Sequence, residues 1–351
     1  MRHNLFTADP AIQAIFKERI LNYFEKENIN YRGNVWLYLK TFIIFVFLLQ
    51  AYLALILSKS PPLIIIETFL LAQSLVMLAI NIGHDANHGS YSPNKKINHI
   101  LGYSIDLIGN NSYYWKYMHN KLHHNFTNIK GIDPDIDANN FMIFSKDFKK
   151  NKIVRYQIFY WPFLYSMLGI LNIFILIPRF YINKKLSGSK IFEIPVKEHF
   201  IYWILKLIYF SFALIIPSFF HSFPNVITTY ISIQIIGGFT LAIIFQVAHI
   251  TEITEKHDVN LISKHKLSWA VHQLNTTANF SSQNKITNWF TGGLNNQIEH
   301  HLFPWVSHVH YPQISKIIKN TCRELGLPYK EFKNFKEAFL SHLTFLRKVS
   351  N

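Results

Sequence analysis

Histidines gathered in three short motifs are the side chains of this 351-residue sequence best suited to chemistry. The motifs are HDANH at residues 84–88, HNKLHH at 119–124 and QIEHH at 297–301. Residues four apart lie on one face of an α-helix, so the two imidazoles of an HxxxH pair can reach one metal ion. In HxxxHH the adjacent third histidine is turned about 100° around the helix, towards a second ion. These motifs predict a site for two metal ions.

The coincidence of the three motifs carries this prediction. With 18 histidines in the chain, chance gives about one HxxxH and about one HH, but HxxxHH only about 0.05 times. A further histidine, His249, ends a long apolar stretch, where titratable groups are rare and often functional. His249 is therefore either another metal ligand or a hydrogen-bonded cap of a membrane helix.

The number and kind of ligands favour iron. Imidazole binds zinc, copper, iron and nickel alike, so the ligand type alone does not name the metal. Eight histidines exceed the four ligands of a tetrahedral zinc, and the HExxH helix of zinc hydrolases is absent. One cysteine, Cys322, cannot support a disulfide, a Cys-rich zinc site or an iron–sulfur cluster. Two octahedral irons with open positions for dioxygen fit these constraints.

Four apolar stretches position the motifs. They cover about residues 41–58, 62–83, 200–220 and 225–249, and each approaches or exceeds the length that crosses a bilayer. Short turns with few charges join them into two hairpins, and half of all residues are hydrophobic. The predicted fold is an all-α integral membrane protein with four transmembrane helices in two hairpins, interfacial helices and a cytosolic helical cap that holds the metals. We expect one domain, residues 1–351.

A fifth apolar stretch, about residues 158–178, is predicted to lie at the membrane interface. If it crossed the bilayer, three spans would separate the motifs at 119–124 and 297–301 and place them on opposite faces. The stretch also contains Pro162, ends at Pro178 and is rich in Trp and Tyr, which are frequent at membrane interfaces. With four spans, the segments that carry nearly all Lys and Arg face the cytosol, as the positive-inside rule requires.

The formal net charge of +15 is distributed between the apolar stretches. No zinc finger or aromatic RNA-binding motif accompanies this charge. It therefore indicates a lipid surface, and no nucleic-acid partner is predicted. The segment from about residue 312 onward, where lysines alternate with apolar residues, is predicted to form surface helices.

Four segments resemble the membrane fatty-acid desaturases, and in particular the front-end branch that includes linoleoyl-CoA desaturases. They are GHDANHG at 83–89, HNKLHHNFTN at 119–128 with GIDPDID after it, FQVAHITE at 245–252, and GGLNNQIEHHLFPWVSHVHYP at 292–312. The resemblance extends from about residue 30 to 325. It is specific at Gln297, where most other branches carry a histidine.

The resemblance implies two irons held by histidines from all three motifs and from the fourth span. Carried over to this sequence, the ligands are His84, His88, His119, His123, His124, His249, His300 and His301. Gln297 occupies a ligand-like position, although an amide is a weak ligand and could act through water. His272 is either a ligand or a supporting residue of the cap. Asp85, Asp133, Glu299, His308 and His310 are candidates to orient the imidazoles.

The implied reaction is the dioxygen-dependent insertion of a cis double bond into a fatty acyl chain carried by CoA or a phospholipid. Acid, base or nucleophilic side chains cannot remove hydrogen from an unactivated methylene, so this reaction needs iron and dioxygen. The His-Pro-Gly-Gly haem motif of fused cytochrome b5 domains is absent. The electron donor is therefore expected to be a separate ferredoxin or cytochrome b5 with its reductase. This absence favours a bacterial inner membrane over the endoplasmic reticulum.

Two alternatives use the same features. A sphingolipid desaturase or lipid hydroxylase would share the scaffold and the metals, and only its product would differ. A membrane metal transporter would need histidines along a path through the spans, whereas seven of the eight assigned histidines lie outside the predicted spans.

Overall fold

Helices form most of the computed structural model, which describes residues 5–6, 10–136, 141–145, 152–186, 189–190, 193–257, 259 and 268–350. By length and composition, four helices of this described part could cross a membrane. They are Val35–Leu57, Pro61–His88, Val196–Ser218 and Phe223–His249. The predicted all-α fold with four spans is confirmed, and each span begins earlier in the sequence than expected.

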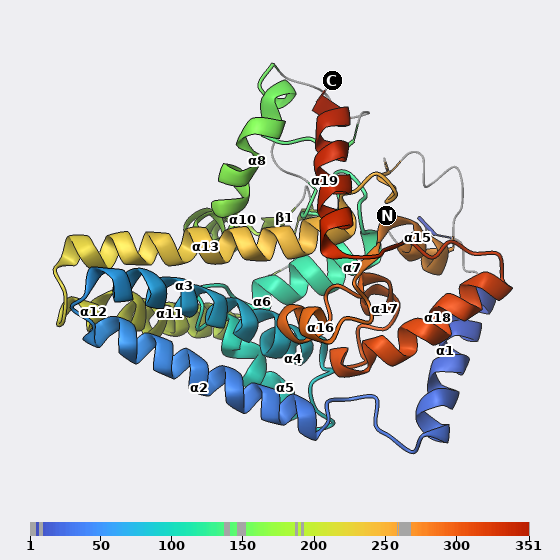
Figure 1. The fold of residues 1–351 in the computed structure, drawn as a ribbon, viewed down its shortest axis with the longest axis horizontal. Coiled ribbons are helices and arrows are strands. Elements are labelled where there is room, and N and C mark those ends of the chain that lie inside the picture. The colour runs from blue at the N-terminus through green and yellow to red at the C-terminus, as the bar shows by residue number, and fades with distance from the viewer. Residues whose placement is uncertain are drawn as a thin grey trace.

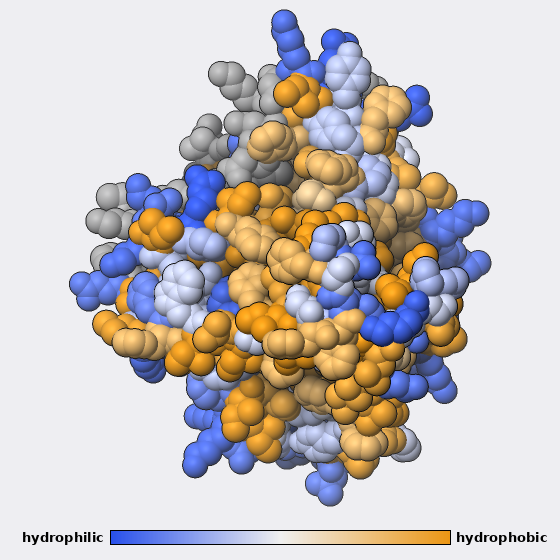
Figure 2. Space-filling view, turned by 90° about the vertical axis from the view of Figure 1, so that its left-hand side faces the viewer, coloured by the Kyte–Doolittle hydropathy of each residue, from blue (hydrophilic) through white to orange (hydrophobic). Residues whose placement is uncertain are grey.

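The long helices lie side by side (Figure 1). They comprise α2 (Val35–Leu57), α3 (Pro61–Leu78), α11 (Val196–Phe210) with α12 (Ile216–Ser218), and α13 (Phe223–His249). Prolines in the first turns of α3 and α13 suit helix starts, where a backbone N–H has no partner. Many of their large side chains point outward, as Phe42 and Ile65 do at 66% and 71% exposure. Apolar residues also cover the central part of the end face of the bundle (Figure 2), as expected of a surface that contacts lipid.

The second span is longer than predicted and contains the first histidine motif. After α3 the chain makes a π-helical turn, Ala79–Gly83, and continues without a break into α4 (His84–His88). Gly83 permits this path, because an added Cβ would lie 2.3 Å from the side chain of Ile105. Two of the eight candidate ligands therefore extend a membrane helix, whereas the sequence predicted them after its end.

The fifth apolar stretch is bent by 62° between its two halves, 154–166 and 168–183. It consists of α8 (Gln157–Ser166), α9 (Leu168–Leu171), a π-helical segment (Asn172–Leu176) and α10 (Ile177–Asn183). Figure 1 shows α8 crosswise to α13 and beside α19 (Phe335–Ser350). Phe159 and Phe163 on its outer side are 79% and 63% exposed. Both halves pack against α13, and the interfacial position of this stretch stays a prediction.

Shorter elements form a cap at one end of the long helices (Figure 1). Helices α1 (Pro10–Lys26) and α18 (Tyr311–Glu324) pack together through a core that includes Phe16, Ile20 and Ile314. The cap also contains α5 (Lys95–Gly102), α6 (Ser112–Trp115), α7 (His124–Phe126), α15 (Trp269–Thr276), α16 (Lys285–Thr291) and α17 (Gln297–Leu302). Strand β1 (Lys185–Leu186) pairs antiparallel with β2 (Ser189–Lys190), and β3 (Asn279–Phe280) pairs parallel with β4 (Glu331–Phe332).

Candidate metal centre

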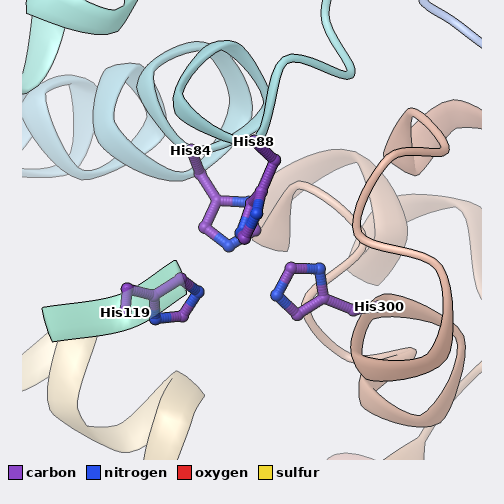
Figure 3. A group of neighbouring side chains, drawn as sticks. All are labelled: His84, His88, His119 and His300. Atoms are coloured by element: carbon purple, nitrogen blue, oxygen red, sulfur yellow. The ribbon is translucent and has the colours of Figure 1, made fainter. Parts of the chain in front are cut away.

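Eight imidazoles from segments far apart in the sequence meet where the long helices enter the cap. Figure 3 shows one group, in which His84 and His88 of α4 face His119 and His300. Two further groups join His123 with His249 and His301, and His124 with His300 and His301, and a last group joins His119 and His123 with Asp135. Within each group, the candidate ligand atoms all lie within 4.8 Å of one another. The structure thus brings together all eight histidines that the sequence proposed as ligands.

This meeting also supports the four-span topology. His119 precedes the bent stretch 154–183 and His300 follows it, yet their rings are 5.8 Å apart. The chain between them must therefore cross the membrane an even number of times. The first crossing is the span Val196–Ser218, which contains α11 and α12, and the second crossing is α13.

The HNKLHH motif is wound as a π-helix, not as the α-helix that its spacing predicted. The segment Lys116–His123 is π-helical, and the N–H of His124 donates to the carbonyl of His119, five residues earlier. On an α-helix these two side chains would be about 140° apart. The π-winding instead brings their Nε2 atoms to 3.1 Å. Such turns are frequent at functional sites, and this one lets three histidines of one motif face the same centre.

Several buried ring nitrogens at the site lack a partner. Among the described residues, no hydrogen bond reaches the Nε2 atoms of His84, His88, His249, His300 and His301. A buried polar atom without a partner is costly, and such atoms are rare unless an ion or water satisfies them. Metal ions held by these nitrogens would remove that cost, so the donor set fits the metal that the sequence predicted.

The electrostatics also suit metal binding. Burial, together with the neighbouring histidines, lowers the pKa of His119, His124, His300 and His301 well below the usual value. These four imidazoles are therefore neutral at physiological pH. The neutral imidazole is the form that binds a metal ion.

Hydrogen bonds at Nδ1 orient three of the rings. Nδ1 of His300 lies 3.1 Å from the hydroxyl of Tyr311, and Nδ1 of His301 lies 2.9 Å from Oε1 of Gln273. Nδ1 of His123 lies 3.2 Å from both carboxylate oxygens of Asp133. A partner at Nδ1 fixes the tautomer and leaves Nε2 available to the metal. The sequence had proposed Asp133 for this role but gave no sign of Gln273 or Tyr311.

The carboxylate of Asp133 also changes the acid–base behaviour of His123. Burial by itself lowers the pKa of this imidazole. The negative charges of Asp133 and Asp135 outweigh burial and raise the pKa to about 9. A carboxylate partner of this kind strengthens an imidazole as a ligand. Asp135, whose Oδ2 lies 3.2 Å from Nδ1 of His123, is a second partner that the sequence analysis missed.

Asp85 contacts the segment after the third motif more closely than it contacts a candidate ligand. Its Oδ2 accepts hydrogen bonds from Oγ of Ser307 and Nδ1 of His308, both at 2.9 Å, while its Oδ1 is 3.8 Å from Nδ1 of His84. Nε2 of His308 in turn lies 3.2 Å from Nζ of the buried Lys40. Asp85 thus ties α4 to the cap, and His308 links it to α2.

Two other predicted orienting residues hold the cap together. The carboxylate of Glu299 accepts hydrogen bonds from Asn279 at 2.7 Å and Tyr329 at 2.9 Å, and these partners lie beside β3 and β4. Nε2 of His310 donates to the carbonyl of Arg32 at 3.0 Å. Both side chains therefore join separate segments of the chain, and these hydrogen bonds go to groups other than the candidate ligands.

The two uncertain ligands differ in their surroundings. Nε2 of His272 donates to the carbonyl of Thr127 at 2.8 Å, and His272 belongs to none of the metal-binding groups of the described residues. Its geometry favours the supporting role over ligation. Gln297 is 1% exposed, and its Oε1 has no hydrogen-bond partner in the described part of the chain. It stays a candidate that could act directly or through water.

Comparison with known proteins agrees with this geometry. Residues 58–333 match the model of the fatty acid desaturase family. The chain is 33% identical to the sn-1 linoleoyl-lipid 6-desaturase of Synechocystis sp. over 98% of this chain and 97% of the relative. It is also 33% identical to the acyl-lipid (8-3)-desaturase of Physcomitrium patens, over 95% of this chain and 71% of the relative. The corresponding 6-desaturase of Arthrospira platensis is 32% identical, with 95% and 90% covered.

The chain belongs to the fatty acid desaturase family. The resemblance stated from the sequence is confirmed, including its affinity to the front-end branch. The protein is a membrane oxidoreductase that desaturates fatty acids, and its histidine clusters are suited to metal ions.

Proposed function

We propose that this protein is a di-iron, dioxygen-dependent desaturase of fatty acyl chains carried on a membrane glycerolipid. The observation that carries the proposal is the convergence of eight histidines into overlapping groups, with His300 shared between two of them. One ion would be held by His84, His88, His119 and His300, and its neighbour by His123, His249 and His301, with His124 between them. Two adjacent ions fit this arrangement better than one.

The substrate class rests on the relatives. The Synechocystis and Arthrospira proteins are named linoleoyl-lipid 6-desaturases, and the Physcomitrium protein is an acyl-lipid desaturase. A glycerolipid substrate is therefore favoured over acyl-CoA. We infer that the new double bond forms between an existing double bond and the carboxyl end, with carbon 6 as the first candidate position.

The chain's own residues provide binding and orientation. Bound iron would supply the dioxygen chemistry that removes two hydrogens from unactivated methylenes. A cavity between α3, α9 and α13, lined by residues such as Val76, Gly169 and Leu241, is suited to an apolar chain. Leu241 lies eight residues before His249, about 12 Å along the helix axis. Such a cavity could hold the methyl end of a chain whose reacting carbons lie near the histidines.

The distribution of charge along the chain indicates the side of the membrane on which the metal site lies. The segments between the hairpins and after α13 carry most of the Lys and Arg. This distribution of positive charge supports a cytosolic position for the metal end of the molecule. A separate ferredoxin or cytochrome b5 would supply electrons there. We favour a bacterial inner membrane as the location.

Heterologous expression tests the proposal. The wild type and a His123→Ala/His124→Ala double variant would be expressed in a host that lacks polyunsaturated lipids and is fed linoleate. Fatty acids would be analysed by gas chromatography with mapping of the double bonds. A new cis double bond with the wild type alone supports the proposal. A hydroxylated product would instead support the hydroxylase alternative.

A further inference from the structure

A groove on the cap is lined by residues that contact or directly follow two candidate ligands, His124 and His301. It lies between α1, α15 and the C-terminal end of α17 with the residues that follow it. Its lining includes Phe16, Lys17, Trp269, Ala270, Leu302 and Trp305. Figure 1 shows these helices at the end of the molecule opposite α12 and the hairpin turns. The groove therefore lies in the cap, at the end of the molecule away from the hairpin turns.

Trp269 connects this groove to the metal centre. Its indole Nε1–H donates to the carbonyl oxygen of His124 at 3.4 Å, and its ring is partly exposed. On the other side of the groove, Leu302 directly follows His301 in the sequence. One hydrogen bond therefore connects the indole of Trp269 to His124. The peptide bond between His301 and Leu302 connects the wall of the groove to His301.

We propose that this groove is the docking site of an acidic one-electron carrier protein, and that electrons enter the metal centre through Trp269. The inference rests on the proposed di-iron function, because that reaction needs electrons from outside. Each turnover consumes one dioxygen, two electrons and two protons, and takes two hydrogens from the acyl chain to form two waters. Two encounters supply these electrons, and each carrier is oxidised by one electron as a ferric ion becomes ferrous.

The chemistry of the groove favours a protein carrier of negative charge. Lys17 is exposed and is the charged member of the groove lining, and the chain as a whole carries +15. The centres of protein interfaces are enriched in Trp, Tyr and Phe, and the groove contains Trp269 and Trp305. Opposite charges would steer an acidic carrier to the groove and raise the rate of encounter.

Reduction kinetics test this inference. Purified, iron-loaded protein in lipid nanodiscs would be mixed anaerobically with reduced two-iron plant-type ferredoxin, an acidic carrier, or with dithionite, a small reductant that needs no docking. Trp269→Leu should slow reduction by ferredoxin severalfold and leave reduction by dithionite unchanged. Lys17→Glu should lower the rate of reduction by ferredoxin about tenfold at low salt, and this rate should then depend less on the salt concentration. Trp269→Phe keeps an aromatic ring in the groove but loses the N–H that contacts His124, so it should slow reduction by ferredoxin less than Trp269→Leu does.

Matched measurements separate the alternatives. Lys336→Glu changes an exposed lysine of α19 outside the groove and should leave both rates unchanged. The inference would be overturned if Trp269→Leu lost the rates of reduction by ferredoxin and by dithionite equally. It would also be overturned if ferredoxin reduced Trp269→Leu and Lys17→Glu as fast as the wild type. A rise in KM for lipid in Lys17→Glu with unchanged reduction would assign the groove to a lipid headgroup. An iron centre that dithionite cannot reduce in the wild type would instead contradict the proposed function.

Discussion

Oε1 of Gln273 lies 2.9 Å from Nδ1 of His301, and the same amide donates through Nε2 to the carbonyl of His124 at 3.0 Å. One buried side chain of α15 therefore positions ligands from the second and third histidine motifs. Neither motif contains it. The relationship arises only when α15 packs beside α17 in the folded cap.

Replacement of Gln273 should loosen the metal centre. We expect Gln273→Leu, which keeps the approximate volume and removes the hydrogen bonds to His124, His301 and Thr127, to weaken metal affinity about 10–100-fold. Titration of metal-free protein with Co²⁺, followed by its visible absorption, measures this affinity. Gln313→Leu on the exposed side of α18 is the control and should bind as the wild type does. Wild-type Co²⁺ affinity in Gln273→Leu would show that the amide does not position His301.

The contact between Asp85 and His308 should stabilise the junction of α4 with the cap. Removing one partner of a buried, charged hydrogen-bond network costs about 3–5 kcal/mol. Asp85→Ala should therefore lower the midpoint of thermal unfolding in detergent by several degrees more than Asp85→Asn, which keeps an acceptor for Ser307. Equal midpoints for Asp85→Ala and the wild type would rule out this stabilising role.

Stability should fall in acid because of His342. This buried imidazole of α19 lies 2.6 Å from the carbonyl of Ile250 and 3.1 Å from the hydroxyl of Tyr165. Burial lowers its pKa to about 4, despite the Ile250 carbonyl, which raises it. Between about pH 6.5 and 4 the unfolded chain binds a proton that the folded protein does not, so stability decreases as pH falls through this window.

The expected loss at pH 5 from this one group is about 2 kcal/mol. His342→Gln cannot be protonated, so its unfolding midpoint should fall less than that of the wild type between pH 7 and pH 5. Because other histidines also titrate, the test compares the two proteins at each pH. The same decrease in both would show that His342 does not contribute to the acid sensitivity.

The ligand set and the membrane topology could be predicted because their signals are local. Each long apolar stretch and each histidine motif is a local pattern within one segment of sequence. An even number of membrane crossings between the motifs then predicts that they lie on the same side of the membrane. The π-winding of Lys116–His123 could not be predicted, because the HxxxHH spacing fits an α-helix equally well. The rings of His88 from α4 and His300 from α17 face His119 in this segment, and these neighbours are known only from the folded structure.

Residues that orient the ligands were the hardest to predict. Asp133 stands close to HxxxHH in the sequence and was proposed to orient an imidazole, and in the structure its carboxylate lies 3.2 Å from Nδ1 of His123. Gln273 and Tyr311 lie in other segments and have no distinctive spacing, so only the folded structure shows their contacts. Asp85 and Glu299 were adjacent to histidines in sequence, but their carboxylates chiefly bind other parts of the cap, because neighbours on a helix point in different directions.

The amount of iron bound by single-ligand variants tests the central claim most directly. His88 belongs to one group of imidazoles and His249 to the other. Mass spectrometry of purified protein should find two irons per chain in the wild type and close to one in each of His88→Ala and His249→Ala. A wild type that holds a single iron, or single variants that each lose all iron or none, would contradict a centre built from two adjacent ions.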